Sequence, residues 1–251
     1  MEERNLSSVS LTQRQWEKIL AFLRARPVGY VGKEAECERF IEAVLWIVRS
    51  GAQWRLLPPD YGAWNSVYKR FDRWSRKGVW EVMQHHFAGD ADMESVMIDS
   101  TVVRAHACSA GMGDQALGRS RGGFSSKIHV QVDALGNPLD FRLSAGQAAD
   151  ITFAPELLSG VTAGHAILDK AYDADTLLML LEKLRMTAVI PPKSNRKVRR
   201  DYDRHLYKER HLVECFIGKI KHYRLVFSRF DKTARNYMSF IRFAATLILL
   251  R

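Results

Sequence analysis

Cysteine is scarce in this chain of 251 residues: the three cysteines, Cys37, Cys108 and Cys215, are scattered and form no CxxC pair. An odd, dispersed set predicts neither a disulfide framework nor a zinc site and is typical of a reducing compartment. The longest apolar run, residues 243–250, is far shorter than the ~20 residues of a membrane helix. Residues 1–5 are charged and no apolar segment follows them, unlike a secretory signal. We therefore expect a cytoplasmic protein that has no membrane partner.

Tryptophan is absent after residue 80, although the chain contains six. This change in composition predicts a separate N-terminal domain with an aromatic core. The polar stretch 89–94 is the expected boundary, because helical periodicity dominates before it and strand patterns follow it. The sequence therefore predicts an all-α domain over residues 1–90 and a second domain over residues 91–251.

One helix of the N-terminal domain has a basic outer face. It is expected over residues 66–75, with Asn65 as its cap, and it carries Lys69, Arg70 and Arg73 opposite its apolar side. A short basic helix after a turn is typical of the recognition helix in a helix-turn-helix module. These three side chains are therefore candidate DNA contacts in a helix-turn-helix-like domain. A solvated surface helix would show the same pattern, so both interpretations stay open.

The second domain shows an ordered series of strand and helix patterns. Three consecutive antiparallel strands followed by alternating helix and strand predict a layered α/β domain, and this order is the ribonuclease-H-like (RNase-H-like) arrangement. In it the first and fourth strands are neighbours. The expected strands are residues 95–103, 126–132, 139–144, 165–168 and 188–190, and the expected helices are residues 150–158, 173–185, 206–221 and 231–249.

Three acidic residues are expected to converge on this sheet. Asp99 lies in the first strand, Asp169 ends the fourth, and Glu214 lies on the helix after the fifth. Magnesium prefers oxygen ligands, and phosphodiester cleavage uses two such ions about 3.5–4 Å apart. We predict that the three carboxylates hold two Mg²⁺ ions, with Mn²⁺ as a substitute. The alternative is that each aspartate is simply a strand-end or turn residue, as a lone aspartate in a strand usually is. Asp173, which is close to Asp169, is interpreted as the cap of the next helix and not as a metal ligand.

Positive charge surrounds the Glu214 helix. The formal net charge is +10, and residues 193–235 hold fourteen Lys or Arg against five Asp or Glu. Such a concentration indicates a polyanionic partner, most often nucleic acid, although a solvated basic face is the alternative. On one α-helix Tyr207, Arg210, Glu214 and Lys221 would share an edge. Tyr207, Arg210 and Lys221 are therefore candidate phosphate contacts, unless this edge is simply a salt-bridged surface.

The spacing Tyr207-x2-Arg210-x3-Glu214-x6-Lys221 resembles the Tyr-Arg-Glu-Lys signature of bacterial DDE transposases. Four further segments, residues 98–106, 118–124, 169–173 and 190–196, are similar to those of the insertion-sequence-five family in particular. The resemblance covers essentially the whole chain. One departure is Ala171, which stands where the family usually has glycine.

This resemblance implies that Asp99, Asp169 and Glu214 are the DDE triad of a transposase. Such an enzyme binds the terminal inverted repeats of an insertion sequence, hydrolyses a phosphodiester at each end and joins the freed 3′-hydroxyls to target DNA. The implied partner is double-stranded DNA, on which the chain would act as a homodimer or larger assembly, associated with the nucleoid. The alternatives are a transposase-derived DNA-binding regulator without catalysis and another nuclease of the RNase-H fold.

Overall fold

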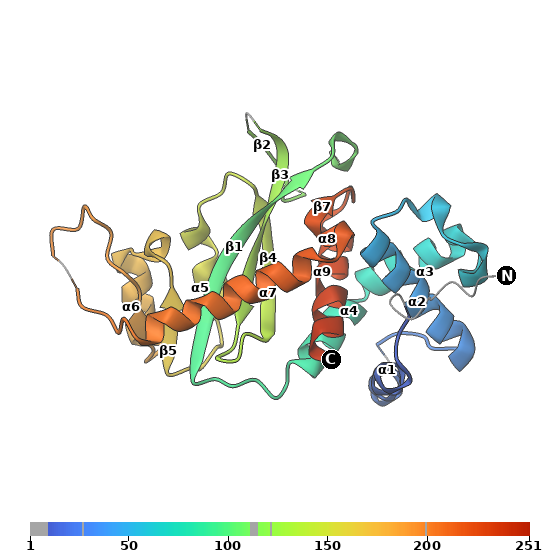
Figure 1. The fold of residues 1–251 in the computed structure, drawn as a ribbon, viewed down its shortest axis with the longest axis horizontal. Helices are drawn as coiled ribbons and strands as arrows, with labels where there is room; N and C mark the ends of the chain where they lie inside the picture. The colour runs from blue at the N-terminus through green and yellow to red at the C-terminus, as the bar shows by residue number, and fades with distance from the viewer. Residues whose placement is uncertain (1–9, 27, 111–114, 121, 199) are drawn as a thin grey trace. The chain divides into compact units, whose positions relative to one another are not determined.

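The computed structural model describes residues 10–26, 28–110, 115–120, 122–198 and 200–251 (Figure 1). The chain divides into two compact units. Unit 1 contains Met1–Phe87 together with Ile220–Arg251, and unit 2 is Ala88–Lys219. The first change of unit therefore lies close to the expected boundary at residue 90, whereas residues 220–251 group with the N-terminal helices. The assignment of residues 1–90 and 91–251 as domains stays a prediction.

Unit 1 is built mainly from helices. The first helix begins after Thr12, whose hydroxyl accepts a hydrogen bond from the Gln15 amide while the Gln15 side chain accepts one from the Thr12 amide. The second ends at Gly51, which adopts the left-handed conformation at φ 65° that favours glycine. The elements are α1 (Gln13–Ala25), α2 (Glu34–Ser50), η2 (Trp54–Leu56), η3 (Pro59–Tyr61), α3 (Trp64–Arg76), α4 (Val79–Phe87), α8 (Arg224–Phe227), β7 (Ser228–Arg229) and α9 (Ala234–Leu249).

The aromatic core of unit 1 combines residues from both parts of the sequence. Phe71 of α3 stacks on Phe240 of α9 with ring centroids 4.3 Å apart, and Trp80 of α4 lies 5.0 Å from Phe243 of α9. Trp74 packs against Trp80 at 5.3 Å. All five side chains are buried. The tryptophan-rich helices thus do not form an aromatic core by themselves, because α9 supplies part of it.

The basic helix α3 differs in detail from its prediction. It begins at Trp64, and its N-cap is Ala63, so Asn65 lies inside the helix and is not the cap. Lys69 and Arg73 are exposed as expected. Arg70 is half-buried: it donates to the carbonyl oxygens of Tyr30 and Val31 at 3.0 and 3.1 Å, and its guanidinium lies 4.4 Å from the ring of Phe40. The helix-turn-helix interpretation of this unit stays a prediction.

Unit 2 is a mixed α/β unit with one sheet. The strands are β1 (Ser95–Ala105), β2 (Gly118–Ser120), β3 (Gly123–Val132), β4 (Pro138–Ala145), β5 (His165–Leu168) and β6 (Thr187–Val189). Their order is β2-β3-β1-β5-β6, with β4 also paired to β3. β1, β3 and β4 pair antiparallel, whereas β5 is parallel to both β1 and β6. The predicted neighbours, the strands that carry Asp99 and precede Asp169, are therefore confirmed, and β2 is an additional strand that was not predicted.

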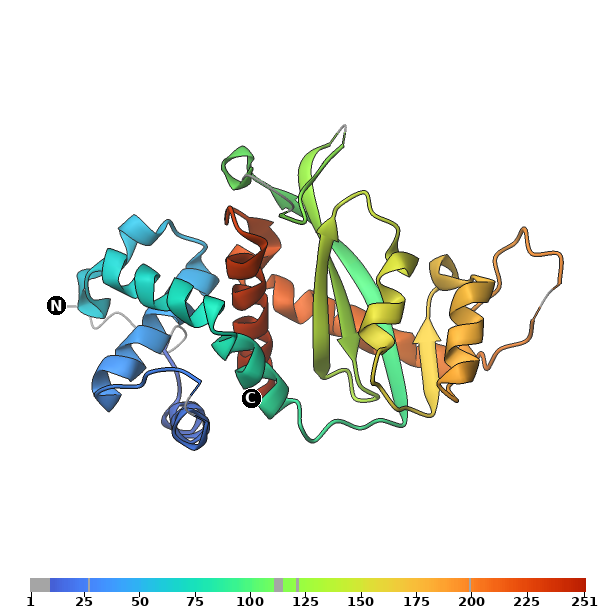
Figure 2. The same cartoon turned by 180° about the vertical axis from the view of Figure 1, so that it is seen from behind.

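Helices cover both faces of this sheet: α5 (Ala154–Leu158) and α6 (Asp175–Lys183) lie on one face, and α7 (His211–Lys221) crosses the other (Figures 1 and 2). Val96 and Ile98 of β1 and Leu168 of β5 belong to the core shared with α5 and α6. Successive strand residues point to opposite faces, so Asp99 belongs to the α7 face. The remaining elements are 3₁₀ turns: η4 (Ala107–Ser109), η5 (Asp150–Thr152), η6 (Lys170–Tyr172) and η7 (Leu206–Arg210).

The register across the sheet gives the same result. Asp99 lies opposite Val130, which in turn lies opposite Phe141 of β4. Residues directly opposite one another share a face of the sheet. Phe141 contacts Phe216 of α7 with ring centroids 5.9 Å apart. Asp99 therefore projects from the face over which α7 lies.

Among the described residues, no helix has both the length and the apolar character needed to cross a bilayer.

Candidate active site

Asp99, within β1, and Asp169, directly after β5, occupy neighbouring positions where the parallel pairing of the two strands ends. Ile98 is paired with Leu168, so the two aspartates follow side by side. Ser100 donates its amide to Asp99 at 2.7 Å, and Ala171 donates its amide to Asp169 at 2.7 Å. Burial raises the pKa of Asp99 and the negative charge of Asp169 adds to this rise, while the Ser100 amide and Arg210 oppose it. The two carboxylates therefore share one electrostatic environment.

Arg210 connects Asp99 to Glu214. One terminal nitrogen lies 2.9 Å from the Asp99 carboxylate, and the other pairs with Glu214 four residues along the chain. The side chains of Arg210 and Asp99 are each 19% exposed, whereas that of Glu214 is 54% exposed. The oxygens of Asp99, Asp169 and Glu214 do not all lie within 4.8 Å of one another. The structure thus brings Asp99 and Glu214 together through a guanidinium rather than by direct approach.

The segment before Glu214 is a 3₁₀ turn, so the prediction of one α-helix over residues 206–221 is wrong for its first five residues. In a 3₁₀ helix residues three apart lie directly above one another. Tyr207 and Arg210 therefore still share a side, in a turn that packs against β5. Burial raises the pKa of Tyr207, with Arg210 opposing this rise and Asp169 adding to it. Lys221 is the last residue of α7, about two turns beyond Glu214.

A polar network lies beside Asp99, and the sequence did not reveal it. Asp150 accepts hydrogen bonds from the Ser100 hydroxyl at 2.8 Å and from the Lys127 ammonium at 2.7 Å. His129 is fully buried, with its Nε2 2.8 Å from the Ser144 hydroxyl, and burial lowers its pKa to about 4. We therefore interpret His129 as a structural residue. Lys127 and Asp150 gave no sequence signal, because their pairing depends on how β3 and the η5 turn meet.

Asp173 anchors the basic segment that precedes η7. Its fully buried carboxylate accepts hydrogen bonds from the Lys193 amide at 2.8 Å, from Arg196 at 2.6 Å and from Arg200 at 2.7 Å. Burial alone would raise the pKa of Asp173, but these hydrogen bonds outweigh it and keep the pKa below its usual value. The prediction that Asp173 caps the next helix is wrong, because Ala174 is the N-cap of α6.

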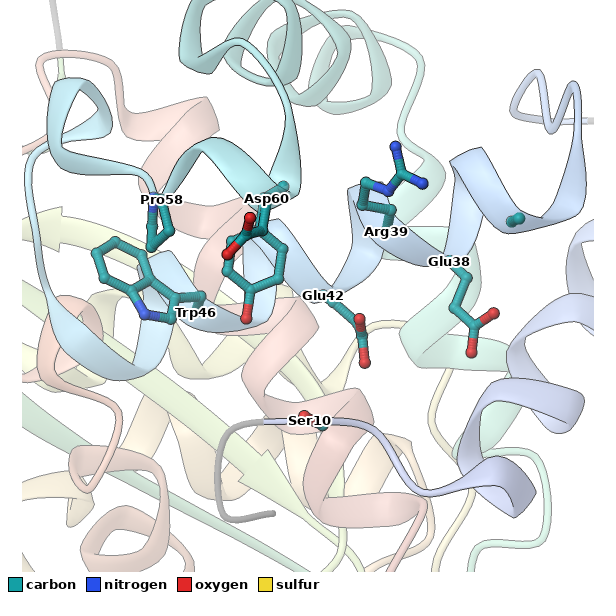
Figure 3. Close-up of a pocket in the computed structure, with 9 residues that line it drawn as sticks. Ser10, Glu38, Arg39, Glu42, Trp46, Pro58 and Asp60 are labelled. Atoms are coloured by element: carbon teal, nitrogen blue, oxygen red, sulfur yellow. The ribbon is translucent and has the colours of Figure 1, made fainter. Parts of the chain in front are cut away.

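Unit 1 contains a pocket of about 390 Å³ that includes none of the predicted site residues (Figure 3). Glu38, Glu42 and Asp60 contribute three carboxylates to its wall, against one guanidinium from Arg39. Burial raises the pKa of Glu42, and the charge of Glu38 adds to the rise. An excess of carboxylates repels phosphate, so this pocket is not where a polyanion would bind.

Comparison with known proteins identifies related sequences along most of the chain. Residues 11–84 match a family described as "Putative transposase of IS4/5 family", and residues 90–249 match the family "Transposase DDE domain". A "Putative transposase for insertion sequence element IS6501" from Brucella ovis is 41% identical over 129 residues, which is 51% of this chain and 99% of that protein. An uncharacterised protein of Sinorhizobium fredii is 38% identical over 124 residues, which is 49% of this chain and 95% of that protein.

Among solved structures, the chain is similar to that of the piggyBac transposase synaptic complex with hairpin DNA. The TM-score is 0.38 at 12% sequence identity. The match covers 73% of this chain and 42% of the piggyBac chain, so this chain spans less than half the length of that protein.

Proposed function

Because this chain belongs to the transposase DDE domain family, we propose that it excises and inserts an insertion sequence. It would bind the terminal inverted repeats, hydrolyse a phosphodiester at each end, and join the 3′-hydroxyls to target DNA. The observation that carries this proposal is the placement of the acids. Asp99 and Asp169 directly follow paired residues of parallel strands. Arg210 joins Asp99 to Glu214, and Glu214 lies on α7, the helix that crosses the same face of the sheet.

The donor chemistry of these residues fits the divalent metal ions that DDE transposase domains use. Asp99, Asp169 and Glu214 offer hard carboxylate oxygens, which suit Mg²⁺ and Mn²⁺. When bound, a pair of such ions supplies activation of the attacking oxygen and stabilisation of the leaving oxygen. A cation and a guanidinium compete for the same oxygens. Arg210 would therefore exchange at least one carboxylate for a phosphate oxygen, to which its planar fork is equally suited.

The chain's own residues would hold the DNA in two places. Tyr207, Arg210 and Lys221 would contact phosphates near the scissile bond and would not read the sequence. Lys69 and Arg73, exposed on α3, would contact the terminal repeat. Arg70 belonged to the same predicted set, but its guanidinium is engaged with Tyr30, Val31 and Phe40, so we assign it the role of holding α3 in place.

The chemistry follows from the order of the nucleophiles. Water attacks the phosphorus first and breaks its bond to the 3′-oxygen, which leaves as the free 3′-hydroxyl; this hydroxyl then attacks a phosphodiester of the target DNA and displaces the target's own 3′-oxygen, which leaves as a hydroxyl. No covalent bond to the protein is needed, because water and the 3′-hydroxyl each attack the phosphorus directly. Two ends must be cut and joined together, so we propose that two or more copies of the chain assemble on double-stranded DNA.

The triad is tested by Asp99→Asn, Asp169→Asn and Glu214→Gln. Each should lower single-turnover cleavage of a terminal-repeat duplex by roughly 10³ or more, because ligands of one metal site act as a unit. Duplex binding, measured without divalent ions, should stay close to that of the unaltered chain. Glu182→Gln is the matched control, since Glu182 is an exposed carboxylate on α6 outside the site. Near-normal cleavage by any triad variant would remove that residue from the site.

The same assay separates the alternatives. A DNA-binding regulator would bind the repeats and show no cleavage in the unaltered chain. A nuclease of another kind would cut without preference for the repeats and without joining the ends to a target.

A further inference from the structure

We propose that a pocket between residues 191–194 and 200–204 of unit 2 binds a backbone phosphate of the DNA strand that runs past the carboxylates. This inference rests on the proposed function, but it concerns residues that lie outside the triad and outside the Tyr-Arg-Glu-Lys signature. The pocket has a volume of about 420 Å³. This volume lies within the usual range of ligand sites, so a sugar and its phosphate can enter it.

The lining of the pocket has the chemistry of an anion site. Three cationic side chains, Lys193, Arg200 and Arg204, face one carboxylate, Asp201, and Ser194 adds a hydroxyl. Guanidinium groups bind phosphate oxygens through paired hydrogen bonds, and an ammonium adds a point charge. The lining of this pocket has an excess of positive charge, whereas the lining of the pocket in unit 1 has an excess of negative charge. Of these two pockets, the one in unit 2 is therefore suited to a phosphate.

One cation of this pocket, Arg200, is held in place before any ligand binds. Arg200 is fixed by its 2.7 Å bond to the buried carboxylate of Asp173. The same carboxylate accepts from Arg196 and from the Lys193 amide, so its single charge is shared between two guanidinium groups. The Nε atom of Arg200 is buried and has no hydrogen-bond partner among the described residues. A wall that is already ordered loses less entropy on binding, which favours affinity.

The pocket is joined to the carboxylate site by two tyrosines. Tyr202 lines the pocket, and its ring meets that of Tyr207 edge to face with centroids 5.5 Å apart. Asp203 accepts hydrogen bonds from the amides of His205 and Leu206 at 2.8 and 2.9 Å, which fixes the start of η7. Tyr207 lies in η7 with Arg210, the residue that contacts Asp99 and Glu214. The pocket and Arg210 are therefore linked through the contact of Tyr202 with Tyr207.

The proposal is tested in the full chain with Arg204→Ala, because Arg204 is exposed and lines the pocket. The matched control is Lys197→Ala, since Lys197 is an exposed cation of the same segment that does not line the pocket. Fluorescence anisotropy would measure binding to a labelled duplex that carries one end of the element and its flank, without divalent ions. We expect Arg204→Ala to weaken binding roughly tenfold at low salt. The plot of log affinity against log salt should become shallower by about 0.9.

Lys197→Ala should leave both quantities unchanged, and Arg204→Lys should recover most of the salt slope. Replacing single phosphates by neutral methylphosphonates should locate the contact: one position should weaken the unaltered chain but not Arg204→Ala. An Arg204→Ala variant with unaltered affinity and salt slope would overturn the proposal. Equal losses in Lys197→Ala would also overturn it, because they would show a general effect of charge.

Inorganic phosphate separates a DNA phosphate from a free one. If millimolar phosphate raises the melting temperature of the unaltered chain but not of Arg204→Ala, while DNA binding is the same in both, the pocket binds a small anion and the DNA assignment is wrong. Failure of the proposed function is a different result. Normal cleavage by Asp99→Asn would reject the triad, whereas the salt slope of Arg204→Ala is a binding measurement that does not depend on cleavage.

Discussion

Arg210 carries one positive charge and contacts two carboxylates. It lies 2.9 Å from Asp99, in surroundings where both side chains are only 19% exposed, and it also pairs with Glu214. The contact with Glu214 contributes little, because that side chain is half exposed and screened by water. The contact with Asp99 matters more, since it offsets both the burial of that carboxylate and the neighbouring charge of Asp169.

Arg210→Ala should therefore destabilise the chain by about 1–3 kcal/mol when divalent ions are removed with EDTA, because it leaves the partly buried Asp99 carboxylate without this partner. Added Mg²⁺ should restore more stability to this variant than to the unaltered chain, because the cation no longer competes with a guanidinium. Thermal melting with EDTA and with MgCl₂ measures both effects. Lys221→Ala, at the end of α7, is the control, and an equal response to Mg²⁺ in the two variants would contradict the competition.

For single residues, the sequence predicted the acidic side chains of the site better than the side chains that pair with them. Asp99 and Asp169 could be found because each follows an apolar strand pattern, and the parallel register then places them side by side. The pairing of Arg210 with Asp99 could not be found, since it depends on the docking of η7 against β5, which joins residues 111 positions apart. The same holds for Lys127 and Asp150.

Asp173 shows why local sequence rules can fail for a single element. Asp173 stands two residues before α6, a place that suggests an N-cap. Its buried carboxylate instead binds a backbone amide and two arginines of the following segment. Strong charged partners distant in sequence outweigh the weaker preference of an aspartate for a helix start. The 3₁₀ geometry of η7 has the same kind of cause, because apolar periodicity does not distinguish a 3₁₀ turn from the first turn of an α-helix.

Asp173→Asn should release this segment. Breaking a buried ion pair from one side typically costs about 3–5 kcal/mol, and the retained amide should soften the loss. Limited trypsin digestion should then cut after Arg196, Lys197, Arg200 or Arg204 much faster than in the unaltered chain. Asp175→Asn is the control, because Asp175 is exposed and pairs with Arg196. Unchanged digestion of Asp173→Asn would show that the segment is held by other contacts.

For the whole molecule, composition predicted a change at residue 90 but not the partner of the last helix. The apolar stripe of α9 shows that the helix is buried, yet it carries no information about which surface covers it. The structure places Phe240 and Phe243 against Phe71 and Trp80 of the N-terminal helices. Strand order, by contrast, was predictable, because consecutive strands and crossovers allow few arrangements.

A fragment of residues 1–90 should therefore fail to fold by itself. Removing a core aromatic ring typically costs about 3–5 kcal/mol, and the fragment loses two, against a typical domain stability of about 5–15 kcal/mol. Near-ultraviolet circular dichroism and urea unfolding would show weak tryptophan signals and no cooperative transition. Adding a peptide of residues 220–251 should restore both. A cooperative transition in the fragment alone would show that α9 is dispensable.

The helices of unit 1 are separated in the chain by all of unit 2, and this has a consequence for synthesis on the ribosome. The nascent N-terminal helices emerge first, but the segment that completes their core follows only after more than a hundred further residues. Strands β1 to β6 all lie within unit 2, so they can pair while those helices still have apolar surface exposed. Unit 1, which carries the basic helix α3, therefore matures after the unit that carries the carboxylates.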